Sequence, residues 1–170
     1  MCIRDRSSTD QGRKSPSNLL TTTLSDENRV ATNFKGKTIG VAIKDRGSIL
    51  SSGHTANAAY WFDSKEGSFI SSTYYLSNLP SWAQEFNDSR HIDNYLKPWE
   101  TYYDISTYIE SGPDNNNYES NFSGEENPVF PHNFKIQNDK TGEPYYGSIS
   151  STPFGNCLLY TSDAADEEAS

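Results

Sequence analysis

A short apolar run from Thr38 to Ile43 is the segment around which the rest of the pattern can be arranged. It is continuous and rich in β-branched residues, which is typical of a strand buried on both faces in a parallel sheet. The run ends abruptly in the ionic residues Lys44, Asp45 and Arg46. Two side chains two positions apart in an extended segment point to the same face, so we expect Lys44 and Arg46 to converge.

Helical patterns lie on both sides of this run. Residues 25–33 begin with Ser25 and Asp26, either of which can cap a helix, and carry acids in the first turn. Residues 79–87 place a proline in the first turn and apolar side chains at helical spacing, namely Leu79, Trp82 and Phe86. Residues 91–96 predict one more short helical segment. The order of helix then strand indicates an α/β unit.

A second strand is predicted over residues 68–75, after the small residues 55–59 and the aromatic residues 60–62. Residues 63–67 contain Asp, Ser, Lys and Gly and predict a turn. The segments on either side of this turn could pair as a hairpin.

The composition changes from Lys97 onward, where aromatic residues, prolines and a long polar stretch over 112–124 replace any regular pattern. A tract of this length without periodicity is unusual in a free domain and suits an excursion that caps or flanks a core. We therefore expect residues 7–96 to form part of an α/β core and residues 97–156 a loop-rich insert of the same domain. The tyrosines and tryptophan between Trp99 and Tyr108 are expected to pack rather than to bind a ligand.

The two ends of the chain resemble translated sequencing adapters. Residues 1–6 and 157–170 are therefore set apart from the fold, although an ordinary short leader and an acidic tail are the alternative. Both cysteines, Cys2 and Cys157, lie in these segments. The remaining chain predicts no disulfide, thiolate metal site or cysteine nucleophile.

The charge and hydropathy exclude two classes of partner. The formal net charge is −9, and no basic run is present, which argues against binding of nucleic acid. No apolar run approaches the ~20 residues that a membrane-spanning helix needs.

The strongest chemical signal is the pair Lys44 and Arg46. Ligands bind at the carboxyl ends of strands in open α/β sheets, and a converging lysine and arginine can hold a phosphoryl group or another oxyanion. The alternative is a surface ion pair with Asp45 or another acid. Residues 21–23 are threonines without a neighbouring base or metal, so no nucleophile is assigned there.

Three histidines, His54, His91 and His132, are too scattered in sequence for a local metal-binding pattern. His54 is nearest to the cation pair in sequence. We expect it to be a core histidine that hydrogen-bonds to backbone rather than a metal ligand.

Several motifs together resemble the bacterial alkaline phosphatases of the type I phosphodiesterase/nucleotide pyrophosphatase branch. They are I-G-V-A-I-K-D-R-G-S-I-L at 39–50, G-H-T-A-N-A-A-Y-W-F-D at 53–63, N-L-L-T-T-T-L-S-D-E at 18–27, S-T-Y-Y at 72–75, L-P-S-W at 79–82 and S-T-P-F-G-N at 151–156. The resemblance covers essentially residues 7–156, and the motifs occur in the expected order.

The resemblance implies an alkaline phosphatase-like α/β fold, with a central, mostly parallel sheet flanked by helices, in a periplasmic or secreted hydrolase. Members hold two zinc ions and use a threonine nucleophile that forms a covalent phosphoenzyme. By motif match, Lys44 and Arg46 contact the non-bridging oxygens of the transferring phosphoryl group. The motifs that carry the nucleophile and the zinc ligands are not recognisable here, so we expect an internal fragment that is inactive alone.

The expected substrate is a small phosphate monoester, because a dianionic phosphoryl group needs positive charge beyond the metals. A phosphodiesterase or nucleotide pyrophosphatase of the same superfamily is the first alternative. A non-catalytic binding protein on the same fold is the second. The sequence leaves the oligomeric state open.

Overall fold

The computed structural model describes residues 10–122, 124–133 and 145–169, and of α4 the side chains only as far as Ser162. Its centre is a sheet of three strands in the order β1 (Ile39–Ala42), β2 (Ala58–Asp63) and β3 (Ser68–Ile70). β1 and β2 are parallel, whereas β2 and β3 are antiparallel. The predicted α/β character and the hairpin are confirmed, but the sheet is mixed rather than mostly parallel over the described residues.

The burial predicted for the first strand is wrong. Every residue of β2 is buried, whereas Ile39 is 37% exposed and the other residues of β1 are half-buried. The reason is position: β1 pairs with β2 alone and forms one edge of the described sheet. A continuous apolar run therefore identified the strand but not its place in the sheet.

Four α-helices accompany the sheet in the described part of the chain: α1 (Leu24–Ala31), α2 (Asp45–Ser52), α3 (Ser81–Asp88) and α4 (Pro153–Ala169). Short 3-10 helices cover Asp10–Gly12, Pro16–Asn18, His91–Tyr95, Ile105–Thr107, Ile109–Ser111 and Gly147–Ser151. The helical segments predicted near residues 25–33, 79–87 and 91–96 are confirmed. Two details differ from the prediction. The N-cap of α1 is Thr23 rather than Ser25 or Asp26, and the strand predicted over 68–75 ends at Ile70.

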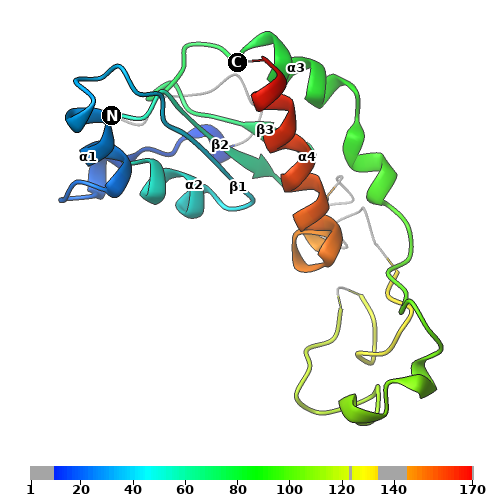
Figure 1. Cartoon of the computed structure of the whole chain (residues 1–170). Helices are drawn as coiled ribbons and strands as arrows, with labels where there is room; N and C mark the ends of the chain where they lie inside the picture. Colours follow the sequence, from blue (N-terminus) through cyan, green and yellow to red (C-terminus); the bar gives the residue numbers. More distant parts are fainter. Residues whose placement is uncertain (1–9, 123, 134–144, 170) are drawn as a thin grey trace.

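The strands separate two apolar clusters. Tyr60 and Phe62 of β2 face α3 and α4, whereas Ala59 and Trp61 face the side of the sheet covered by α2. This alternation follows from the two-residue period of a strand. Figure 1 shows the resulting layers, with α2 on one side of the sheet and α3 and α4 on the other.

The loop-rich segment that begins after Leu96 extends away from the sheet over its described residues as far as Asn133, beyond the first turn of α4 (Figure 1). Its described residues form short 3-10 helices and one isolated bridge between Trp99 and His132. α4 continues past Asn156, and Leu158 is 2% exposed within the apolar core. Part of segment 157–170, which the sequence analysis excluded from the fold, is thus packed against the sheet. No helix in the described ranges has the length and apolar character needed to span a bilayer.

Close packing of α2 on β1 depends on Gly40. The Ser48 hydroxyl donates to the Gly40 carbonyl at 3.0 Å. A Cβ at position 40 would collide with the Ser52 hydroxyl and lie 3.1 Å from the Ser48 carbonyl oxygen. Only glycine lets the helix backbone come this near to the strand.

The segment that directly follows α2 is held by the buried carboxylate of Asp26. This carboxylate accepts hydrogen bonds from the backbone and hydroxyl of Thr23, which completes a capping box at α1. It also accepts from the backbone of His54 at 2.9 Å and from the backbone and hydroxyl of Thr55, both at 2.8 Å. One side chain therefore joins the start of α1 to the segment that leads into β2.

We expect Gly40→Ala to lower the free energy of unfolding by about 1–3 kcal/mol, because the added methyl group forces α2 away from β1. In a Ser52→Ala background the loss should be smaller, since the nearest colliding atom is then absent. Urea denaturation of the four proteins measures both effects. Equal losses in the two backgrounds would contradict this packing.

A second prediction concerns acid stability. Burial alone raises the pKa of Asp26, but hydrogen bonds from Thr55 and Thr23 outweigh it and lower the pKa from 3.8 to about 2. The stabilisation is therefore complete above pH 4 and lost as the pH falls towards 2, an effect of about 2 kcal/mol. Asp26→Asn should be less stable at pH 7 and should lack this part of the pH dependence. If plots of unfolding free energy against pH were parallel for the native protein and Asp26→Asn between pH 5 and 2, this role of Asp26 would be disproved.

Candidate anion-binding site

The structure places Lys44 and Arg46 at the N-terminal end of α2. Lys44 is the N-cap residue, and its carbonyl accepts the first helical hydrogen bond from Ser48 at 3.1 Å. Asp45 occupies the first helical position and accepts from the Arg46 backbone N–H at 2.8 Å. An acid is favourable there because a helix N-terminus carries partial positive charge. The predicted extended geometry is wrong, since the helix begins directly after Lys44.

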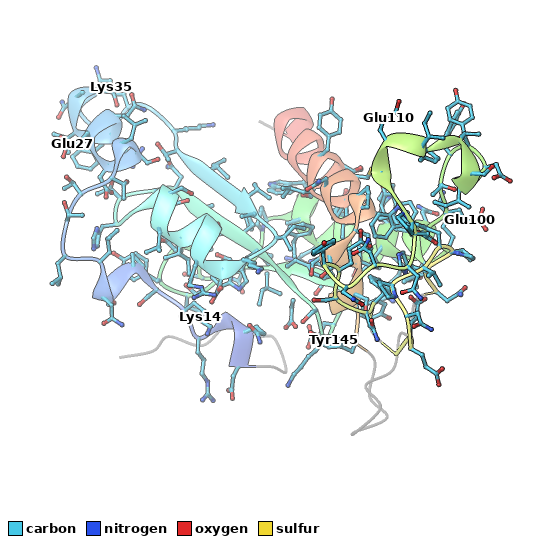
Figure 2. All side chains as sticks on the ribbon, turned by 90° about the horizontal axis from the view of Figure 1, so that it is seen from below. Lys14, Glu27, Lys35, Glu100, Glu110 and Tyr145 are labelled. Atoms are coloured by element: carbon cyan, nitrogen blue, oxygen red, sulfur yellow. The ribbon has the colours of Figure 1, made fainter. Side chains whose placement is uncertain are left out.

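Two hollows flank this helix end. One, of about 210 Å³, is lined by Lys44 together with Ser64 and Tyr145. The other, of about 300 Å³, is lined by Arg46 together with Arg13 and Lys14. Asp45 contributes to both walls. Lys14 and Tyr145 mark the two hollows in Figure 2 and lie well apart.

The acid between the two cations is paired with neither of their side chains. The Asp45 carboxylate lies 3.5 Å from the Lys14 Nζ. Over the ranges that the structure describes, no acidic side chain forms a salt bridge with Lys44 or Arg46. The alternative of a surface ion pair with Asp45 is therefore not what the structure shows. Both cations are exposed, next to the positive end of α2.

The sequence did not predict a role for Lys14. This residue lies far from Asp45 along the chain, in a polar segment that carries no pattern of its own. No local spacing could have identified the contact, because it depends on how the N-terminal segment folds back along α2.

Histidines and acids do not gather into a metal site in the described part of the chain. His54 Nδ1 lies 3.6 Å from Asp26, and His132 Nδ1 lies 2.7 Å from Glu125. Each is a pair, and no group of three or more histidine, cysteine or acidic side chains is placed to hold a metal ion there. The described residues therefore do not fit a zinc centre of three or four protein ligands.

His54 lies at the far end of α2 from the cation pair. It follows Gly53, the C-cap of the helix, and a helix of this length extends about 12 Å. Its backbone N–H donates to Asp26, and its ring is near the same carboxylate. Although His54 and Lys44 are close in sequence, they do not share a site.

An aromatic cluster surrounds His132 in the loop-rich segment. The ring of His132 is 4.5 Å from that of Phe130 and 5.2 Å from that of Trp99, measured between centroids. Trp99 packs as predicted. Tyr102 and Tyr103 contact each other but are 88% and 64% exposed, so the prediction that this run packs is wrong for them.

Comparisons with known proteins identify relatives of the chain. It is 48% identical over 162 residues to alkaline phosphatase PhoV of Synechococcus elongatus and 42% identical over 157 residues to alkaline phosphatase PafA of Elizabethkingia meningoseptica. Each match covers 91% of this chain. The crystal structure of wild-type PafA superposes with a TM-score of 0.81 at 34% identity, over 98% of this chain. Over nearly its whole length, the chain therefore matches part of an alkaline phosphatase in sequence and in fold.

Other comparisons qualify this assignment. A protein of Myroides odoratus, named calcium-transporting ATPase, is 49% identical over 148 residues, or 86% of this chain. A PafA variant with four substitutions superposes with a TM-score of 0.82 at 36% identity, over 98% of this chain and 33% of that one. No family model matches the sequence. The chain spans between 26% and 29% of the length of these curated relatives and 33% of the wild-type PafA chain.

Proposed function

We propose that Lys44 and Arg46 bind the non-bridging oxygens of a phosphoryl group in a hydrolase of phosphate monoesters. The observation that carries the proposal is the charge arrangement at the start of α2. Two exposed cations flank a helix N-terminus, and the acid between them is engaged by Lys14 instead. An anion approaching this end of the helix would meet positive potential from Lys44, from Arg46 and from the helix N-terminus itself.

The two side chains suit this task in different ways. Arginine presents a planar fork of donors that matches two phosphoryl oxygens, whereas lysine provides a compact point charge. Phosphoryl transfer spreads negative charge over the non-bridging oxygens, and donors fixed near them stabilise the transition state. Because Lys44 and Arg46 line different hollows, the phosphoryl group would lie across the helix end rather than inside either hollow.

The relatives support this assignment. Two of them are named alkaline phosphatases. The PafA variant of known structure carries alanine in place of a lysine and an arginine two positions apart, together with substitutions of a threonine and an asparagine. The same spacing separates Lys44 from Arg46.

Zinc, a threonine nucleophile and a covalent phosphoenzyme remain part of the proposal for the whole protein. We place the metal centre outside the described residues, because these do not gather a metal-binding set. A periplasmic or secreted location belongs to the same proposal.

Two alternatives use the same geometry. A phosphodiester offers one fewer anionic oxygen, so two cations without acidic partners favour a monoester. A non-catalytic phosphate-binding protein would need the cations but no metal. The relative named as an ATPase also implies phosphoryl chemistry, in which bound cations neutralise the same oxygens.

Arg46→Ala should weaken binding of inorganic phosphate to the chain by about tenfold, because it removes a charge-assisted contact. Arg46→Lys should recover only part of this loss, since an ammonium group lacks the fork. Calorimetric titration with phosphate measures both. Lys35→Ala is the control, because Lys35 is exposed and lies away from both hollows (Figure 2). Unchanged affinity in Arg46→Ala would refute the proposed site.

The chain by itself should not hydrolyse a chromogenic phosphate monoester in the presence of zinc. The reason is that its described residues supply no cluster of metal ligands. A colorimetric assay with and without a chelator gives the answer. Turnover that depends on zinc would show that the metal centre has been placed wrongly.

A further inference from the structure

We infer that Lys14 is a positioning residue that keeps the Asp45 carboxylate away from Lys44 and Arg46. This inference rests on the proposed function, since it explains why two cations beside an acid remain available to a phosphoryl group. Asp45 is adjacent in sequence to both cations and would be their nearest ionic partner. In the structure its carboxylate points to Lys14 instead, at 3.5 Å.

The Asp45 carboxylate is held at both oxygens. Oδ1 accepts the Arg46 backbone N–H at 2.8 Å, and Oδ2 faces the Lys14 ammonium. The side chain of Asp45 is 24% exposed and that of Lys14 is 43% exposed. The backbone contact orients the carboxylate, and the ammonium compensates its charge from the side.

The segment that carries Lys14 is itself anchored to the sheet. The indole N–H of Trp61, in β2, donates to the Gln11 carbonyl at 3.1 Å. Pro16 is buried, and Ser15 caps the short helix that begins there. Lys14 lies between these two anchors, so its backbone is fixed beside α2 even though its side chain reaches solvent.

Removal of Lys14 would leave Asp45 without a cationic partner. A carboxylate and a guanidinium form a bidentate pair readily, so Asp45 would turn to Arg46 and compete with phosphate for the same donors. Exposed ion pairs contribute little free energy, which limits the expected loss of phosphate affinity to roughly threefold to fivefold.

The decisive experiment is a double-mutant cycle on phosphate affinity, measured by titration of the full chain with inorganic phosphate. Lys14→Ala should weaken binding by about threefold to fivefold in the native background and by less than about twofold in the Asp45→Asn background. If Lys14 acted only through its distant charge, or bound the anion directly, the two factors would be equal. Equal factors, or no effect of Lys14→Ala in the native background, would overturn the inference.

Arg13 provides a matched control. It lines the same hollow as Lys14 and is 45% exposed, but it pairs with Asp10 at 3.2 Å. Arg13→Ala should leave phosphate affinity within about twofold, as expected for loss of an exposed ion pair. A loss as large as that of Lys14→Ala would indicate that the hollow is an anion subsite and would overturn the positioning role. Lys14→Arg should retain native affinity, because it preserves the pairing with Asp45.

A readout independent of phosphate separates this inference from the proposed function. In NMR spectra without phosphate, the Arg46 side-chain Nε–H signal should shift in Lys14→Ala and return in the double variant with Asp45→Asn. A shift together with unchanged phosphate affinity in Arg46→Ala would sustain the positioning role and reject the phosphate site. An unshifted Arg46 signal would reject the positioning role alone.

Discussion

The packing of α2 against the parallel strands β1 and β2 fixes the place of Lys44, Asp45 and Arg46 in the candidate site. Gly40 lets the helix backbone approach β1, and a Ser48 hydroxyl closes that contact. Directly after the C-terminal end of the helix, the Asp26 carboxylate holds the segment between α2 and β2 to the start of α1. These contacts hold the helix on the sheet, and its first residues lie at the carboxyl end of β1.

That position determines the electrostatics of the site. Because the helix begins directly after Lys44, the positive end of α2, Lys44 and Arg46 are gathered within one turn. The same geometry brings Asp45 into the middle of the group, where it could cancel the charge. Lys14, anchored through the Trp61 indole to the sheet, engages that acid from outside. Trp61 therefore connects the core of the fold to the segment whose Lys14 leaves Lys44 and Arg46 available.

Sequence reasoning could predict the local elements because their signals are local. The apolar run at β1, the turn before β3 and the apolar face of α3 each depend on neighbouring residues. It also singled out the two cations. It could not predict that β1 forms a sheet edge, that the residues after it become helical, or that Lys14 pairs with Asp45. Each of these depends on contacts between distant segments. The sequence alone could not show whether Asp45 pairs with Lys44, with Arg46 or with Lys14.

A crystal structure of the chain with a bound phosphate analogue such as vanadate would test the anion site itself. We expect an oxyanion at the N-terminal end of α2, within hydrogen-bond distance of the Lys44 ammonium and the Arg46 guanidinium, with Asp45 still paired to Lys14. An anion bound elsewhere, or Asp45 paired with Arg46 at an unoccupied helix end, would contradict this arrangement.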